Sequence, residues 1–334
     1  MHSPMTLRRT TLTVLAMTAL ASGASAQVAV QAPANGRTAV QEAEVLFNQG
    51  RRADAAGLLG RHLAEQQNDG RGWFFLGRIY LDNAQLWHRE GHDPDEPGPL
   101  LLEFSGAAME QAQQLLADSG SVFRVLVSVE RALNRIEADG WQAATARPVP
   151  AHEVPLPQVL VELGRNLMVS CPANGVLVTG SLAEVASVWG VRLTSAVRPD
   201  LVLLRSDLYA ADVRYRGRMA AALGIDSMLA LPEAIGAAGR YRPVCLGPSL
   251  DTIAAPGVEW AASRMVLLGG AAAAVDSTAL VIHQFEMMGL AGSVWTASAR
   301  DVYDLAARRN RALCGELFSD VGTGQRPAIP ACTR

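Results

Sequence analysis

The sequence predicts two folded parts, a run of paired helices followed by an α/β domain whose sheet is mostly parallel. In the range 38–138, apolar residues recur at helical spacing. In the range 174–208, a short apolar run, a helical segment and a second apolar run follow one another, which is typical of a β-α-β unit. The proline-rich segment 147–157 between these parts is predicted to be a linker.

Residues 1–26 have the three features of an export signal. Arg8 and Arg9 give a positive start, an apolar run follows at 12–20, and Ala24-Ser25-Ala26 resembles a cleavage site. The apolar run is much shorter than the roughly 20 residues that a membrane helix needs. We therefore expect an exported, periplasmic protein with no transmembrane segment in the mature chain. The paired arginines leave the export route open between the general secretory and the twin-arginine pathways.

Composition excludes several classes of function. The net charge is −3, so no strong positive field would attract nucleic acid. The chain has no lysine, and its 29 basic side chains are all arginine, which excludes a Schiff-base lysine and a P-loop lysine. Aromatic residues make up only 5% of the chain, too few to suggest a stacking platform for single strands.

Four cysteines make disulfides possible in an oxidising compartment. We favour a bond between Cys314 and Cys332, because it would hold the predicted tail 319–334 to the helix before it. Cys171 and Cys245 are predicted near strands, where they would be either a second disulfide or buried thiols. No Cys-x-x-Cys spacing occurs, so no zinc or redox motif is predicted and no cofactor is expected.

The predicted flexible leader, 27–37, precedes a helical domain at 38–146. Within this domain, Trp73, Leu76, Gly77 and Tyr80 resemble the first helix of a tetratricopeptide repeat. Only about two repeats fit, below the three or more that a free-standing array needs, so we expect the array to lean on the second domain. Its groove would then either dock a partner through Trp73 and Tyr80 or be filled by its neighbour.

The segment after the third predicted helix is rich in possible metal ligands, among them His88, His92 and Asp93. Histidine nitrogens and carboxylate oxygens suit zinc or another divalent ion. The two histidines would share a face only on a helix, which Gly91 and Pro94 oppose. A solvated acidic loop is therefore the favoured interpretation, and a metal site is the alternative.

The predicted α/β domain spans 158–318 and alternates strands with helices. Two closing helices are expected at 271–288 and 299–318. The expected strands are 176–178, 201–204, 242–246 and 260–268, and the earlier helices are 158–167, 182–189 and 210–223. This order predicts a Rossmann-like domain.

The same stretch carries a family resemblance over roughly 174–268. The motifs are NGVLVTG, VRPDLVLLRSDLY, YRPVCLGPSL and GVEWAASRMVLL, whose last arginine is Arg264. They resemble the soluble exported domain of bacterial membrane proteins of the protein O-mannosyltransferase-like, C-type glycosyltransferase class. The resemblance implies a Rossmann-like fold and an accessory role near envelope glycosylation. It does not imply glycosyl transfer, because the multi-spanning catalytic part is absent, and the family's acidic loop after Thr179-Gly180 is here reduced to Glu184.

Ligands of parallel sheets bind beyond the carboxyl ends of the strands. The residues predicted there as candidate ligand contacts are Thr179, Gly180, Ser181, Arg205, Asp207 and Ser249. Arg205 would face an anion, and the helix start at Ser181 would add backbone N–H groups. The alternative is ordinary helix capping by Ser181 and Asp207.

No catalytic motif accompanies these residues. The sequence has no GxSxG, GxGxxG, Walker or HExxH motif, and His283 is the only histidine of the second domain. Arg214, Tyr215 and Arg218 instead suggest an interaction face, because arginine and tyrosine are enriched in protein interfaces. The sequence thus predicts a non-catalytic accessory or scaffold protein that binds an envelope or membrane-complex protein. The alternative is an enzyme, or a glycan-binding or small-ligand-binding protein, that uses the strand ends.

Overall fold

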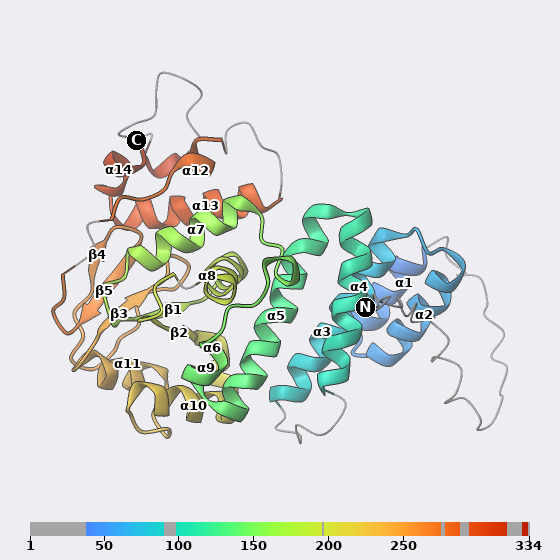
Figure 1. The fold of residues 1–334 in the computed structure, drawn as a ribbon, viewed down its shortest axis with the longest axis horizontal. Helices are drawn as coiled ribbons and strands as arrows, with labels where there is room; N and C mark the ends of the chain where they lie inside the picture. The colour runs from blue at the N-terminus through green and yellow to red at the C-terminus, as the bar shows by residue number, and fades with distance from the viewer. Residues whose placement is uncertain are drawn as a thin grey trace, which may run out of the picture. The chain divides into compact units, whose positions relative to one another are not determined.

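The computed structural model describes residues 38–89, 98–195, 197–274, 278–287, 294–318 and 329–332. The predicted export signal and leader lie outside these ranges, as does most of the predicted tail. Residues Ala39 to Arg334 belong to one compact unit (Figure 1). No helix in the described ranges is long and apolar enough to cross a membrane.

The N-terminal part is a run of helices in which sequence neighbours pack on one another. Its five long helices are α1 (Ala39–Asn48), α2 (Arg52–Glu65), α3 (Gly70–Arg89), α4 (Gly98–Leu115) and α5 (Ala117–Asp139). A break separates α2 from α3, because α2 ends at Glu65 and α3 begins at Gly70. Asp69 produces it, because its Oδ1 accepts hydrogen bonds from the N–H groups of Arg71 and Gly72, which begin α3, at 3.0 Å each.

Gly77 lies where α3 packs against α4. Ser105 Oγ on α4 donates to the Gly77 carbonyl oxygen at 2.8 Å. A Cβ at Gly77 would lie 2.8 Å from the Met109 side chain. The Leu76-Gly77 pair of the repeat-like motif therefore has a packing role, whereas assignment of this array to the tetratricopeptide class stays a prediction.

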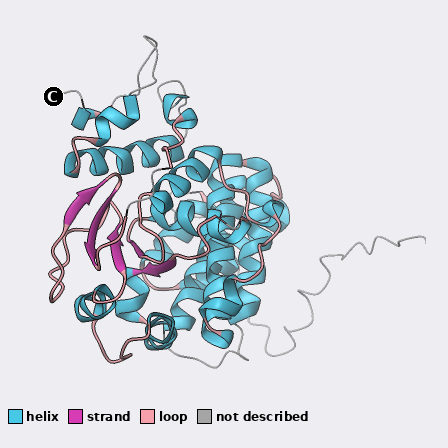
Figure 2. Cartoon of the chain, turned by 60° about the vertical axis from the view of Figure 1, so that its left-hand side comes forward, coloured by secondary structure: helices cyan, strands magenta, loops and turns pink. Residues whose placement is uncertain are grey.

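Among the described residues, the sheet has five strands in the order β2-β1-β3-β5-β4. Figure 2 shows the strands of this sheet in magenta. The strands are β1 (Val176–Thr179), β2 (Val202–Arg205), β3 (Pro243–Leu246), β4 (Ala261–Ser263) and β5 (Val266–Gly270). β1 pairs in parallel with β2 and β3, but β5 pairs antiparallel with both β3 and β4. The sheet is thus mixed, and the expectation of a mostly parallel sheet holds only for its first three strands.

The expected single strand at 260–268 is in fact the hairpin of β4 and β5. Arg264 lies in its turn with a φ of 48°, a backbone conformation that most side chains disfavour. Asn310 Nδ2 donates to the Arg264 carbonyl oxygen at 3.0 Å and helps to hold this turn. This tight turn explains why β4 and β5 pair antiparallel.

Helices cover both faces of the sheet. One face carries α7 (Gln158–Val169), α8 (Leu182–Thr194) and α13 (Val294–Arg309); the other carries α9 (Ser206–Ala211), α10 (Val213–Leu223) and α11 (Leu231–Gly239). Figure 1 shows α7 and α13 on one side of the strands and α10 and α11 on the other. All four residues of β1, of β2 and of β3 are buried, as expected for strands covered on both faces.

Apolar packing is continuous from the middle of the helical run into the sheet. One buried cluster extends from Leu81 on α3 to Ala331 near the C-terminus, whereas a smaller cluster joins α1, α2 and the start of α3. Between the helical run and the sheet lie α6 (Trp141–Thr145) and the short helix η2 (Ala151–Glu153). The segment 147–157 packs on the fold, because Val149 N–H donates to Leu193 O and Val154 is buried.

The closing helices differ from the expectation. Only α12 (His283–Met287) is helical in the described part of 271–288. Glu162 on α7 begins this helix, because its carboxylate accepts from Gln284 N–H at 2.6 Å and from Phe285 N–H at 2.7 Å. The apolar, alanine-rich composition of 271–288 suggested a longer helix. Instead, the buried side chain of Asn166 on α7 forms hydrogen bonds with both the N–H and the carbonyl oxygen of Val281, which hold the chain just before α12 in a non-helical path.

The other closing segment is two helices, α13 and α14 (Leu313–Phe318), with a break after Arg309. The disulfide between Cys314 and Cys332 is present, as favoured from the sequence, and closes a separation of 18 residues. Cys171 and Cys245 form a second disulfide over a separation of 74 residues. Two disulfides are typical of exported proteins, which mature in an oxidising compartment.

Candidate functional site

The predicted ligand site lies at the topological switch point of the sheet. The chain leaves β1 toward β2 on one side, while β3 pairs on the other side of β1. The carboxyl ends of β1 and β3 therefore flank the crevice in which open α/β sheets usually bind ligands. Gly180 and Ser181 follow β1, and Ser249 follows β3, so the fold does bring these three predicted residues together.

Glu184, from the first turn of α8, fills this crevice with its own carboxylate. Its Oε2 accepts from Ser249 Oγ at 2.7 Å and from Gly180 N–H at 3.0 Å. Its Oε1 accepts from Ser249 N–H at 2.7 Å. Glu184 is completely buried. An internal carboxylate thus occupies the donors that an anionic ligand would use at this helix start.

Ser181 is the N-cap of α8 and forms a capping box with Glu184. Ser181 Oγ accepts from Glu184 N–H at 3.3 Å, while Ser181 N–H donates to Ser249 Oγ at 2.8 Å. The capping interpretation of Ser181 is therefore correct. Small residues allow this close arrangement, since a Cβ at Gly247 would lie 2.7 Å from Glu184 Oε2 and a Cβ at Gly180 would lie 2.5 Å from the Leu250 side chain.

Arg205 ends β2 and is only 7% exposed. Its Nη2 donates to Asp207 Oδ2 at 2.7 Å, and its Nη1 donates to Glu130 Oε1 on α5 at 3.0 Å. Burial disfavours its charge, but the carboxylates of Glu130 and Asp207 outweigh that effect and raise the pKa of Arg205. Arg205 therefore binds the α/β part to the helical run rather than facing an open cleft.

The network around Arg205 includes groups that the sequence did not indicate. Glu130 Oε1 also accepts from Gln85 Nε2 at 2.8 Å, so α3, α5 and β2 meet at one carboxylate. Thr179 is buried and donates through Oγ1 to Leu204 O at 3.3 Å. All the predicted strand-end residues thus interact with other groups of the chain, which gives each of them a structural role.

The predicted interaction face on α10 is only partly on the surface. Tyr215 is fully buried, and its hydroxyl accepts from Arg205 N–H at 3.1 Å, so it does not lie on a surface that a partner could reach. Burial raises its pKa above the ordinary range. Arg218 donates through Nε to Glu137 O at 2.6 Å and so satisfies a carbonyl at the end of α5. Arg214 is exposed.

Trp73 and Tyr80, the other predicted partner contacts, are half-buried on α3. Trp73 Nε1 donates to Gln67 O at 2.8 Å, which ties α3 to the turn before it. The Tyr80 ring packs on Phe104 of α4, with ring centroids 5.5 Å apart. Both side chains therefore contribute to packing between neighbouring helices, and a role in partner binding stays a prediction.

A cavity of about 700 Å³ lies next to α10. It is lined by the end of α3, the start of α4, the end of α5 and one face of α10. The lining residues are Trp87, Pro99, Asn134, Glu137, Ala138, Val213, Arg214, Gly217, Arg218 and Ala221. We call it the α5–α10 groove. Its size lies within the range of about 300–1,000 Å³ that is usual for binding pockets.

The metal site proposed at His88, His92 and Asp93 stays a prediction. His92 and Asp93 lie outside the described residues, and only the backbone of His88, on α3, is described. Among the residues that are described, no group of three or more His, Cys, Asp and Glu side chains has a geometry that could hold a metal ion.

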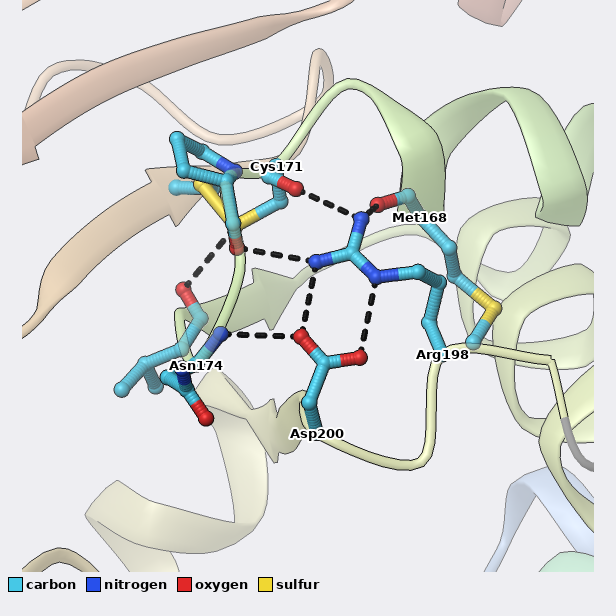
Figure 3. A network of polar contacts seen from close by, with 8 residues as sticks. Met168, Cys171, Asn174, Arg198 and Asp200 are labelled. Carbon is cyan, nitrogen blue, oxygen red and sulfur yellow. Dashed lines mark hydrogen bonds and ion pairs between the residues drawn. A yellow bond between two sulfur atoms is a disulfide. The ribbon is translucent and has the colours of Figure 1, made fainter. Parts of the chain in front are cut away.

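Arg198 and Asp200, from the Arg-Pro-Asp motif, form the polar network of Figure 3. The Arg198 guanidinium donates to the carbonyl oxygens of Met168 and Cys171 at 2.8 Å each and pairs with both carboxylate oxygens of Asp200. Asp200 also accepts from Asn174 N–H at 2.8 Å. This network fastens the end of α7, next to a disulfide, to the start of β2. The motif therefore has a structural role here.

Replacing Asp200 with asparagine is expected to destabilise the protein at neutral pH and to have less effect in acid. Burial alone would raise the pKa of Asp200, but hydrogen bonds from Arg198 and Asn174 outweigh it and hold the pKa below its ordinary value of 3.8. A lowered pKa stabilises the folded state above that ordinary value, and this stabilisation is lost as the pH falls through the folded-state pKa. Urea unfolding at about pH 7 and about pH 3 measures the difference. A deficit of equal size at both pH values would contradict the prediction.

Comparison of the chain with protein-family models, with curated proteins and with solved structures found no match. The resemblances to tetratricopeptide repeats and to the exported domain of C-type glycosyltransferase-like proteins therefore remain predictions from motifs.

Proposed function

We propose that this protein is an exported, non-catalytic scaffold of the periplasm, and that it binds a segment of another envelope protein in the α5–α10 groove. The observation that carries this proposal is the exposed apolar character of the groove. Val213, at the first position of α10, is 72% exposed and lines it beside Trp87, Pro99 and Ala138. Exposed apolar side chains gathered in a hollow are typical of interaction sites.

The contrast with the strand ends supports binding of a protein segment over binding of a small polar ligand. At the strand ends, Glu184 and Ser249 satisfy the available donors, and Arg205 is paired with two carboxylates. An anionic ligand would have to displace these internal carboxylates, each of which is held by charge-assisted hydrogen bonds. The crevice is therefore a poor candidate for an active site or a glycan site.

The charges at the groove indicate the chemistry of its partner. Arg214 and Arg218 lie on the α10 side, and Glu137 is the one acidic residue among the described lining residues, so the lining carries a net positive charge. A segment with an apolar side chain flanked by an acidic one would match both features. We propose such a segment, from an envelope or membrane-complex protein, as the occupant.

Replacing Val213 with glutamine is expected to weaken capture of this partner about tenfold. A buried valine contributes about 1.5–3 kcal/mol of apolar contact, and 1.4 kcal/mol corresponds to a factor of ten in affinity. The measurement is cross-linking of the tagged, full chain in intact envelopes, followed by quantitative mass spectrometry. Only a protein whose recovery falls in the Val213→Gln variant counts as the partner.

Val294 provides the matched control. It is also the first residue of its helix, α13, it is 66% exposed, and it lies outside the groove lining. Val294→Gln should leave recovery of the partner within about twofold of the wild type, since no apolar contact is lost. Equal recovery of every cross-linked protein from wild type and Val213→Gln would refute a binding role for the groove.

A further inference from the structure

Arg192, in the last turn of α8, is a buried arginine without a hydrogen-bonded partner among the described residues. It is 8% exposed, and its Nε is buried with no partner there. The equally buried Arg205 pairs with two carboxylates, and Arg198 pairs with Asp200 and with backbone carbonyls. A buried charge without a partner is destabilising unless something else compensates it.

The surroundings of Arg192 compensate its charge only in part. Its Cζ lies 6.0 Å from the centroid of the Trp141 ring, at the outer limit of a cation–π interaction. Burial lowers the pKa of the guanidinium, and the charge of Asp200 partly offsets this effect. The Asp200 oxygens, however, already accept from Arg198 and Asn174. A net positive charge therefore remains at this place.

Arg192 is one of the residues that line a cavity of about 250 Å³. Its lining includes Trp141, Gln142, Pro148, Arg192 and Pro199. The volume is well above the roughly 30 Å³ that one water molecule takes up and below that of most drug-sized pockets. The indole and the two prolines offer apolar walls, and the Gln142 amide is exposed and adds donors near the guanidinium.

The ends of two helices oppose an anion here, since α6 ends at Thr145 and α8 ends at Thr194. Several of the last carbonyls of α8 are already satisfied. Thr194 Oγ1 donates to Gly190 O at 2.8 Å, and Ser195 Oγ donates to Val191 O at 2.7 Å. The opposing effect of each helix end is roughly a third of the gain from a hydrogen bond to a charged group, so the two ends together stay below that gain. The unpaired guanidinium therefore outweighs the helix ends, and the cavity favours an anionic ligand.

We propose that this cavity is a binding site for a small organic monocarboxylate. The carboxylate would pair with the Arg192 guanidinium, whose planar fork matches two carboxylate oxygens. The apolar body would lie against Trp141 and the prolines. A single cation in the described lining favours a singly charged ligand over a doubly charged phosphate. This site is independent of the α5–α10 groove and of the proposed scaffold function.

The test uses benzoate as the probe and benzamide as its neutral counterpart, with the full chain in a chloride-free buffer. Saturation-transfer NMR detects binding, and the change in tryptophan fluorescence on titration gives the affinity. We expect saturable benzoate binding to the wild type and at least about tenfold weaker binding of benzamide, because the latter lacks the charge. No saturable benzoate binding, or equal affinity for the two compounds, would overturn the proposal.

Substitutions test whether benzoate binds at Arg192. Arg192→Met should weaken benzoate binding roughly 10- to 100-fold, while the melting temperature without benzoate stays equal or rises, because the unpaired charge is gone. Gln142→Ala, at an exposed position, should weaken benzoate binding a few-fold with no change in stability.

The control is Arg165→Met, at an exposed arginine on α7 outside this cavity. This variant should bind benzoate as the wild type does. Equal affinity in Arg192→Met, or a lower melting temperature of that variant, would contradict the proposed role of the arginine.

Discussion

Replacing Glu184 with alanine is expected to lower the free energy of unfolding by about 4 kcal/mol, among the largest effects of a single substitution in this chain. The change leaves Gly180 N–H, Ser249 N–H and Ser249 Oγ, which are partly buried, without their acceptor. Each such loss costs about 1–3 kcal/mol, and a cavity forms where the carboxylate was. Urea unfolding followed by circular dichroism measures the loss.

The same variant should be rescued by formate. Its missing carboxylate leaves a small cavity whose donors still point inward from the β1 and β3 loops, so a free carboxylate can occupy it. Formate should therefore raise the midpoint of unfolding of Glu184→Ala and leave that of the wild type unchanged. Glu233→Ala, at an exposed position near the start of α11, serves as the control and should lose little stability. A loss below about 1 kcal/mol for Glu184→Ala would show that the crevice does not depend on this carboxylate.

Removing the disulfide between Cys171 and Cys245 is expected to destabilise the protein by about 4.5 kcal/mol, against about 3 kcal/mol for the bond between Cys314 and Cys332. The two bonds close separations of 74 and 18 residues, and the longer loop restricts the unfolded chain more. The first bond also joins the end of α7 to the central strand β3. Double cysteine-to-serine variants compared by urea unfolding give both values.

The order in which the two disulfides are reduced in the intact protein gives a second, kinetic comparison of them. Cys171 and Cys245 are fully buried, whereas Cys314 and Cys332 are partly exposed. A mild reductant should therefore open the bond between Cys314 and Cys332 first, because attack requires access to sulfur. Alkylation and peptide mapping at successive times identify the order. Simultaneous opening of both bonds, or a larger loss of stability from the shorter loop, would contradict this account.

Local sequence signals located most of the elements. Polar breaks such as Asn68-Asp69-Gly70 and helical spacing gave the order of the N-terminal helices, and apolar runs gave β1, β2 and β3. The helix α11 was missed, since Leu231–Gly239 is short and contains Pro232 and two glycines, which favour a loop. The antiparallel edge was missed as well, because strand direction depends on a pairing that the sequence does not display.

At the candidate site, too, the sequence indicated some contacts, and only the fold showed the others. Position in the sequence placed Gly180, Ser181 and Ser249 together at the strand ends, and the fold confirms that placement. It could not show that Glu184 turns back into the crevice or that Glu130, 75 residues before Arg205, takes the arginine. The capping-box spacing of Ser181 and Glu184 was the one local signal for the first of these contacts.

Residues close to one another in the chain were enough to indicate the alternation of helices and strands, the cysteine pair nearest the C-terminus and the lack of a catalytic motif. Which polar groups form hydrogen bonds or ion pairs within the chain, and which do not, depends on the tertiary structure. Arg205 and Arg192 look alike in sequence, each next to an apolar run. One meets two carboxylates and the other meets none in the described structure, and only long-range packing brings such partners within hydrogen-bonding distance.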